Sequence, residues 1–461
     1  MTEFNCFFNP KTIAIIGASE AFKFGYGPTH YLLNSNFKTY PVNLTKNEIF
    51  GHKAYKNVKD IPDDIDLALI IVGNDNVLQA VKDCVEKRVK GIIIETAGFA
   101  ETGIDKYIKI QKEIEQIAKH SKVRIIGPNC VGVTNFINGF TTSEVDVNKI
   151  VKGNISIIAQ SGVLGNVVID WAISEKIGFS KAITLGNKVD IDEIDMLEYL
   201  QEDPDTTVIT IYLEDVRRGK EFLSVLKKIT KPIIVLKNGR SESGAIAIRS
   251  HTASIAGNDR IFDAILKQNP NVFRVNNFYQ MFDIAHAFAT QPLPKGKNIV
   301  VITGSGSMGI IACDEIERQG LILAKLDQNT INSMKQVAPN WVSVKNPVDL
   351  GPSQFNTFVP SLKAVLSDNN VDCLLFIFTV PQMPLETWNL SITQHLRHLK
   401  NFSKEFKKPC IICVFGSRWV YEYVLKDAVK FKIPVMTQIK YAIKAFKMMY
   451  EFGQHLDRKN R

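Results

Sequence analysis

A single histidine lies in a stretch of small and hydroxylated residues that could carry chemistry. The stretch runs from Gly239 to Asp259 and contains three glycines as well as His251. It has too little apolar surface to pack firmly, so we expect it to form a mobile surface loop. An imidazole titrates near neutral pH, which suits nucleophilic attack or proton transfer. For an arbitrary loop histidine, the commoner alternative is an exposed side chain in a flexible linker.

An acid and a candidate anion site are expected at the same sheet edge as this loop. Three apolar runs are typical of buried strands: residues 155–159, 208–213 and 232–236. The run at 155–159 is followed by Ser161 and Gly162 and then by a predicted helix at 163–173. The run at 208–213 ends at Glu214, and the run at 232–236 precedes the histidine loop. Because parallel strands end at one edge of a sheet, we expect these features to meet there.

The turn at Ser161 and Gly162 has two interpretations of about equal weight. The first backbone N–H groups of a helix have no partner inside the helix and lie at its positive end, so the turn could bind an anion. It could equally be an ordinary connection between a strand and a helix. Glu214 alone would more often be a solvated loop carboxylate, but the shared edge favours a role in orienting the imidazole.

The first third of the chain predicts a doubly wound parallel sheet. Residues 12–16 form a short apolar run that ends in the turn Gly17-Ala18-Ser19, as a Rossmann-like sheet begins. The glycine spacing is looser than G-x-G-x-x-G, so it is a weak dinucleotide signature. Further strands are expected at 39–42, 67–72, 91–95 and 123–126. Their carboxyl ends carry small or polar residues that would line one crevice, among them Asn43, Gly73, Gly98 and Asn129.

A third unit follows the linker at 291–296. The strand predicted at 299–302 ends in a glycine-rich turn, 303–309, which opens a predicted helix at 310–319. The turn is a second candidate anion site, and it lacks the Lys-Ser/Thr pair of a P-loop. Strands are expected at 373–380 and 410–415, with a basic amphipathic helix at 441–461.

Composition excludes several classes of protein. The chain has 461 residues, of which 45% are hydrophobic and 22% are charged, and its formal net charge is +9. A scattered positive excess without dense basic blocks argues against nucleic-acid binding and fits polyanionic small ligands. Seven cysteines in mostly apolar surroundings indicate a reducing compartment. Cys410 and Cys413 are expected in a buried strand, and we expect no metal site. The absence of a membrane-length apolar run and of a signal-peptide pattern predicts a cytoplasmic protein.

The ordered motifs resemble those of one family. They are Gly17-Ala18-Ser19, Pro41-Val42-Asn43, Gly127-Pro128-Asn129-Cys130-Val131-Gly132, Gln160-Ser161-Gly162, Gly186-Asn187-Lys188-Val189-Asp190, Tyr212-Leu213-Glu214 and Ser250-His251-Thr252-Ala253-Ser254-Ile255-Ala256-Gly257. The set is similar to the NDP-forming acyl-CoA synthetases, in the branch of the alpha subunit of ADP-forming acetate–CoA ligase, which is related to succinyl-CoA synthetase. The resemblance implies an α/β fold with a Rossmann-like CoA-binding domain at 1–130 and two flavodoxin-like ligase domains. These are 131–290, with a phosphohistidine loop at 239–258, and 291–461.

The resemblance also implies roles for individual residues. His251 matches the phosphorylated histidine and Glu214 the acid that orients it. The phosphate-binding residues are Ser161 and Gly162 at one helix start and Gly306, Ser307, Met308 and Gly309 at the other. The CoA-binding residues are Gly17, Ala18, Ser19, Lys23, Val42, Asn43, Val72, Asn129 and Cys130.

The activity implied is acyl-CoA + phosphate + ADP ⇌ carboxylic acid + CoA + ATP, with a swinging phosphohistidine. Coenzyme A would bind this chain, and ATP or ADP with Mg²⁺ would bind an ATP-grasp beta subunit in an α2β2 hetero-oligomer; neither a nucleic acid nor a membrane is an expected partner. Ala253 and Ile255 stand where the family usually has Gly and Leu. The bulk of Met308 leaves open whether the acid is acetate or a longer or aromatic acid.

Two other functions remain as alternatives. One is a catalytically silent CoA-binding regulatory or scaffold protein of the same fold, against which the presence of both His251 and Glu214 counts. The other is an NAD(P)-dependent dehydrogenase. Such an enzyme would have an acidic residue at the end of the second strand, where this chain has Asn43.

Overall fold

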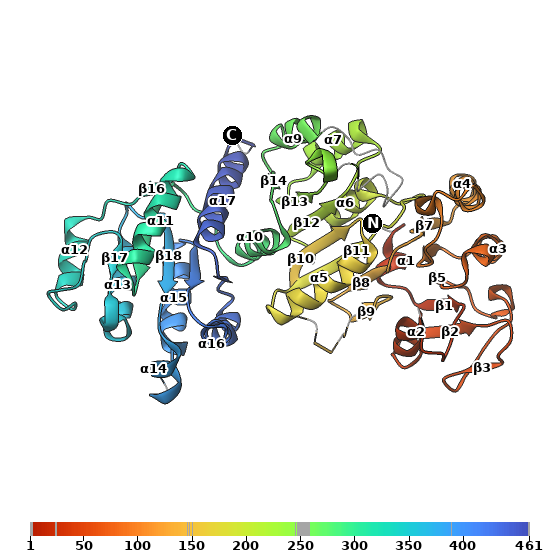
Figure 1. Cartoon of the computed structure of the whole chain (residues 1–461), viewed down its shortest axis with the longest axis horizontal. Helices are drawn as coiled ribbons and strands as arrows, with labels where there is room; N and C mark the ends of the chain where they lie inside the picture. The colour runs from red at the N-terminus through yellow and green to blue at the C-terminus, as the bar shows by residue number, and fades with distance from the viewer. Residues whose placement is uncertain are drawn as a thin grey trace. The chain divides into compact units, whose positions relative to one another are not determined.

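A computed structural model describes residues 3–23, 25–144, 146, 148–149, 151–244, 246, 259–388 and 390–459. The chain forms two compact units, Met1–Phe278 and Tyr279–Arg461, and each is described by itself (Figure 1). His251 lies outside the described residues.

The first unit begins with a five-stranded parallel sheet in the order β2-β1-β5-β6-β7. Its strands are β1 (Thr12–Ile16), β2 (Lys38–Val42), β5 (Leu67–Ile70), β6 (Gly91–Ile94) and β7 (Arg124–Ile126). Its helices are α1 (Asn5–Phe8), α2 (Tyr26–Leu33), α3 (Asn74–Glu86) and α4 (Asp105–His120), and β3 (Glu48–Ile49) pairs with β4 (His52–Lys53) in a small hairpin. The strands are continuous apolar runs because α3 and α4 cover one face while α1 and α2 cover the other.

A seven-stranded sheet follows in the same unit, in the order β14-β13-β12-β10-β11-β8-β9. Its strands are β8 (Val133–Asn135), β9 (Phe140–Thr141), β10 (Lys152–Ala159), β11 (Phe179–Thr184), β12 (Val208–Leu213), β13 (Ile233–Lys237) and β14 (Val272–Arg274). Its helices are α5 (Gly162–Ser174), α6 (Glu193–Glu202), α7 (Gly219–Lys228) and α9 (Asp259–Lys267). Strands β10 to β14 are parallel, and β8 and β9 extend the sheet as antiparallel strands.

The two sheets of this unit meet along a seam at the end of β7. The N–H of Asn187 donates to the carbonyl of Pro128 at 2.8 Å, and the N–H of Val189 donates to the carbonyl of Gly127 at 3.1 Å. Gly186 has a left-handed backbone with φ 59°, and a Cβ added there would lie 2.1 Å from the carbonyl oxygen of Pro128. The guanidinium of Arg124 closes the seam by donating to Asp190 at 3.0 Å. Only glycine fits this position, because any Cβ would clash with the turn after β7.

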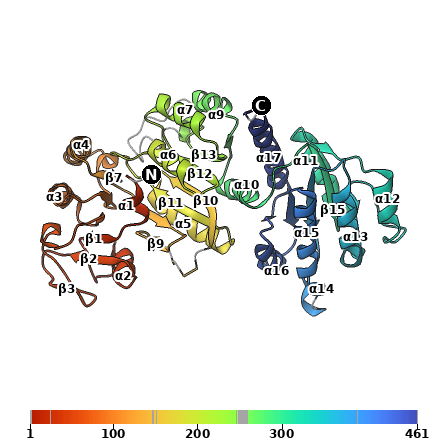
Figure 2. The same cartoon turned by 180° about the vertical axis from the view of Figure 1, so that it is seen from behind.

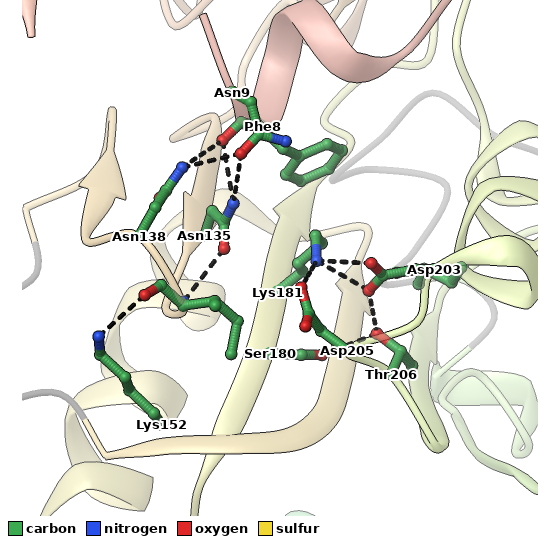
Figure 3. Close-up of polar contacts among 12 residues, drawn as sticks. Phe8, Asn9, Asn135, Asn138, Lys152, Ser180, Lys181, Asp203, Asp205 and Thr206 are labelled. Carbon is green, nitrogen blue, oxygen red and sulfur yellow. Dashed lines mark hydrogen bonds and ion pairs between the residues drawn. The ribbon is translucent and has the colours of Figure 1, made fainter. Parts of the chain in front are cut away.

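Polar side chains add two anchors to the second sheet (Figure 3). The amide of Asn135 donates to the carbonyl of Phe8 at 3.0 Å, which ties the N-terminal segment to β8. Elsewhere in the sheet, the buried ammonium of Lys181 donates to Asp203 at 2.8 Å and to Asp205 at 3.2 Å. Because α6 ends just before Asp203, this ion pair lies toward the amino ends of the strands.

The second unit contains a parallel sheet in the order β16-β15-β18-β19-β20, and β17 also pairs with β15. The strands are β15 (Asn298–Thr303), β16 (Ile322–Leu323), β17 (Val348–Asp349), β18 (Cys373–Phe378), β19 (Cys410–Val414) and β20 (Val435–Met436). The helices are α11 (Gly306–Arg318), α12 (Gln328–Lys335), α13 (Gln354–Ser367), α14 (Gln382–Thr387), α15 (Thr393–Phe406), α16 (Arg418–Ala428) and α17 (Ile439–Lys459), while α10 (Phe278–Thr290) begins at the boundary between the units. Helices α11 and α17 pack against each other, and α13 packs against α15, as the view from behind also shows (Figure 2).

The α/β class and the parallel, doubly wound sheets predicted from the sequence are confirmed. The pattern missed β8 and β9, which are too short to show a period. Strand β17, which pairs with β15, was likewise not among the strands expected from the sequence. Cys410 and Cys413 lie in the buried strand β19, as expected. Among the described helices, none is long and apolar enough to cross a membrane. The three domain ranges stay predictions.

Replacing Gly186 with alanine is expected to destabilise the first unit by more than the same change at Gly103. Both glycines have left-handed backbones, which costs alanine about 1–2 kcal/mol. Gly103 meets no described atom within 4 Å of an added Cβ, whereas Gly186 meets the carbonyl oxygens of Pro128 and Asn129, so we expect an additional loss of ~1–3 kcal/mol. The midpoints of urea unfolding measure the difference. Equal midpoints for Gly186→Ala and Gly103→Ala would show that the seam is not tightly packed.

Candidate active site

A cavity of 340 Å³ lies at the carboxyl edge of the first sheet. Strand β1 has β2 on one side and β5 on the other, and ligands bind at such a point in an open α/β sheet. Predicted site residues that line the cavity are Gly17, Ser19, Lys23, Val42, Asn43 and Val72. The structure therefore brings together six of the nine residues predicted to bind CoA.

The turns after β1 and β2 are held together by Asn43. Its amide donates to the carbonyl of the buried Ala18 at 2.9 Å, and its own carbonyl oxygen accepts from the N–H of Thr45 at 2.9 Å. Gly17 has φ 94°, and a Cβ there would lie 2.4 Å from the carbonyl oxygen of Ile71. A small residue is needed here because the β1 turn lies directly against the end of β5.

Sequence reasoning missed several residues of the cavity wall. The cavity is also lined by Leu44, Lys56, Asn57, Asn76, Gln79 and Asp83. Lys56 adds a second cation to Lys23 and lies in a loop with no recognisable motif, so a single sequence carries no signal for it.

Asn129 and Cys130 lie apart from the described lining of this cavity, at the end of β7. The thiol of Cys130 is 2% exposed and donates to the carbonyl of Ile94 at 3.3 Å, and burial raises the pKa of this thiol far above its ordinary value. A Cβ added at Gly162 would lie 3.3 Å from the Cα of Cys130. The structure thus places Cys130 beside the start of α5, and Asn129 precedes it at the carboxyl end of β7.

The start of α5 leaves backbone donors available. Ser161 occupies the N-cap with an extended backbone, and its side chain makes no capping bond within the described chain. Gly162 begins the helix. In contrast, the Asp192 side chain caps α6 by accepting from the N–H of Ile194 at 2.8 Å. Amides without a side-chain cap at a helix N-terminus form a suitable site for a phosphate group.

Glu214 directly follows β12 and is 5% exposed. Its Oε1 accepts from the hydroxyl of Tyr212 at 3.3 Å, and burial together with the Glu214 charge raises the pKa of Tyr212 to about 12. Because β12 neighbours β10, this acid lies on the strand next to the one that leads into α5. The edge predicted to hold Ser161 and Glu214 is therefore present, and the histidine role of residue 251 stays a prediction.

The side chain of Gln160 links the two strand ends. Its Oε1 accepts from the N–H of Glu214 at 2.9 Å and from the N–H of Asp215 at 3.1 Å. Its Nε2 donates to the Asp215 carboxylate. Lys188, also buried, donates from Nζ to Asp215 Oδ1 at 2.8 Å and to Glu193 at 3.1 Å. Burial opposes ionisation of Asp215, but Lys188, Gln160 and Arg217 together outweigh burial and hold the pKa of this carboxyl below its ordinary value.

The second unit has a similar helix start at Gly306, Ser307, Met308 and Gly309. Ser305 is the N-cap of α11, and no side-chain capping bond is found there among the described residues. A Cβ at Gly306 would lie 2.9 Å from the Asp349 carboxylate. No group of three or more potential metal ligands occurs in the described parts of either unit.

Comparison with known proteins identifies the family. Residues 11–135 match a CoA binding domain, and residues 152–288 match a succinyl-CoA ligase like flavodoxin domain. The chain is 41% identical to the alpha subunit of ADP-forming acetate–CoA ligase II of Pyrococcus furiosus, over 90% of both chains. It is 35% identical to the ADP-forming 4-hydroxybutyrate–CoA ligase of Nitrosopumilus maritimus over 96% of this chain, which spans 64% of that longer protein.

A solved structure is similar over nearly the whole chain. It is the acetyl-coenzyme A synthetase 1 of Ca. Korarchaeum cryptofilum in complex with phosphate and ADP. The TM-score is 0.88 at 30% identity, covering 98% of this chain and 97% of that one. The resemblance inferred from the ordered motifs is confirmed, and the chain belongs to the ADP-forming acyl-CoA synthetase family of acid–thiol ligases.

Proposed function

We propose that this chain is the alpha subunit of an ADP-forming acyl-CoA synthetase that works through phosphohistidine at His251. The observation that carries the proposal is the edge shared by Ser161, Gly162 and Glu214. There a buried acid lies on the strand next to a helix start that has no side-chain cap within the described chain. A phosphorylated imidazole needs both an acid to orient the ring and amide donors for the phosphoryl oxygens. The sequence similarity to ADP-forming ligases supports the same reaction.

The reaction proceeds in three balanced steps. A phosphate oxygen attacks the thioester carbonyl, the C–S bond breaks, and CoA leaves as the thiol after taking a proton. The His251 imidazole then attacks the phosphorus of the acyl phosphate, and the P–O bond to the acyl group breaks to release the carboxylate. Finally the phosphoryl group passes from the imidazole to ADP, which forms ATP and restores the histidine. The proposed contribution of Glu214 is to hold one ring tautomer.

CoA is proposed to occupy the 340 Å³ cavity of the first sheet. Lys23 and Lys56 supply positive charge for its phosphate groups, and the β7 end at Asn129 and Cys130 leads from this sheet toward α5. The thioester end would then reach the helix start at Ser161. This route explains why some predicted CoA-binding residues line the cavity, whereas Asn129 and Cys130 lie at the end of β7.

The remaining components are proposed to come from elsewhere. A beta-subunit partner is supported by similar chains that are alpha subunits. ADP with Mg²⁺ would bind that partner, which is proposed to be an ATP-grasp chain assembled with this one as α2β2. The acid is proposed to be a small carboxylic acid. Relatives named for acetate and for 4-hydroxybutyrate support the class and leave its chain length to experiment.

Incubating the chain and its beta subunit with γ-labelled ATP is expected to place acid-labile label on His251. Phosphoramidate bonds of histidine hydrolyse in acid, whereas phosphoserine esters survive it. His251→Ala should abolish the label and the net synthesis of acyl-CoA. Label that persists in His251→Ala contradicts the proposal, whereas a wild-type chain that takes up no label favours a silent CoA-binding protein.

Glu214→Gln is expected to slow formation of phosphohistidine about 10²-fold, since a neutral amide no longer holds the ring in one tautomer. Rapid-quench measurement of label on His251 gives the rate. The control is Glu198→Gln, which changes an exposed carboxylate 3.9 Å from Lys228 in the same unit. Equal rates for the two variants would remove Glu214 from the mechanism.

Lys23→Ala and Lys56→Ala are each expected to weaken CoA binding about tenfold, the loss of one charge-assisted hydrogen bond of about 1.5 kcal/mol. Added salt should reduce the difference, because exposed charges are screened. Titration calorimetry with CoA provides the measurement. Lys112→Ala, on the exposed side of α4, serves as the control. Unchanged affinity in both cavity variants would place CoA elsewhere.

A further inference from the structure

We infer that Gln160, Asp215 and Lys188 are positioning residues, which fix Glu214 beside the first turn of α5 and balance the charge that a phosphoryl group brings there. The inference rests on the proposed function and extends it to three side chains outside the predicted site. None of the three is expected to touch the substrate.

The geometry of Gln160 leaves its side chain one orientation. The amide oxygen accepts from two backbone N–H groups, those of Glu214 and Asp215, while the amide nitrogen donates to the Asp215 carboxylate. If the Gln160 amide were rotated so that its oxygen and nitrogen changed places, all three hydrogen bonds would be lost. Gln160 also directly precedes Ser161 in the chain. One side chain therefore sets the position of the acid relative to the helix start.

Lys188 holds the other side of Asp215. Its ammonium donates to Asp215 Oδ1 at 2.8 Å, to the Asp215 carbonyl at 3.1 Å and to Glu193 at 3.1 Å, so its three protons all have acceptors. The side chain is 1% exposed. Its backbone has φ 55°, a left-handed conformation that is unfavourable for lysine. Such a conformation persists where the surroundings determine it, and here the three bonds of the ammonium do so.

Charge at this edge depends on Lys188. Glu193, Glu214 and Asp215 are three carboxyl groups that are all at most 5% exposed. The other charged or titratable groups facing Asp215 are Arg217, whose Nε lies 3.6 Å from its Oδ2, and Lys237, while Tyr212 faces Glu214. Arg217 is largely solvated, with 43% of its side chain exposed. A phosphoryl group with two negative charges would therefore meet uncompensated carboxylates if Lys188 were neutral.

The same unit offers a matched control for a purely structural ion pair. Lys181 is also buried, with a side chain 2% exposed, and it also binds two carboxylates, Asp203 and Asp205. It lies in the regular strand β11, toward the amino ends of the strands. Lys181→Met and Lys188→Met thus remove the same charge from the same kind of pair, but only the second removes it at the proposed site.

The experiment measures single-turnover labelling of His251 from γ-labelled ATP in the complex with the beta subunit, from about pH 5 to pH 9. Lys188→Met is expected to slow labelling about 10- to 100-fold. It should also move the acidic limb of the plot of labelling rate against pH about one pH unit upward. The direction follows because loss of a nearby positive charge raises the pKa of carboxyl groups. Lys181→Met should lower the melting temperature but keep the profile of the wild type. Gln160→Met should slow labelling without moving the limb, because it removes no charge.

The outcomes separate the inference from the proposed function. Wild-type protein without label on His251 overturns the proposed function itself. Labelled wild type together with Lys188→Met kinetics equal to those of Lys181→Met overturns the inference alone. If Lys188→Met fails to fold by circular dichroism, Gln160→Met decides, and a wild-type labelling rate in that variant overturns the inference.

Discussion

The close approach of Gly186 to the carbonyl oxygens of Pro128 and Asn129 is the constraint on which the first unit depends. The carboxyl edges of the two sheets lie side by side because the segment after β11 runs along β7 and its turn. The same segment then continues into Lys188, which reaches Asp215, and into Asp190, which binds Arg124. One stretch of five residues thus joins the sheets and sets the charge at their common edge.

The candidate site is built from donors on the backbone and acceptors on side chains. The start of α5 has no side-chain cap among the described residues, although α6 in the same unit is capped by Asp192. A helix start without a cap keeps its first amides available for an anion. Glu214 contributes the opposite charge from the neighbouring strand. This separation of the amide donors from the Glu214 carboxylate suits a group that is transferred as a phosphate.

The cavity of the first sheet shows why a glycine fingerprint was a weak guide. Its shape comes from the order of the strands, which opens a space at the end of β1, and from Asn43, which ties the turns after β1 and β2. Gly17 matters because its backbone lies against Ile71, so a Cβ would have no room. Residues such as Lys56 and Gln79 enter the wall from segments with no motif of their own.

The sequence by itself determined the α/β class, the main parallel strands with their helices, and the family, but not the short strands β8, β9 and β17. Local signals suffice for these, because apolar runs and glycine turns report on burial and chain reversal within a few residues. It also identified Ser161 and Glu214 as neighbours, since adjacent parallel strands end at one edge. Only the tertiary structure separated Asn129 and Cys130 from the cavity of the first sheet and brought Gln160, Lys188 and Asp215 into contact. These contacts join residues 27 to 55 positions apart, and their geometry depends on how the sheets pack, which no local pattern encodes.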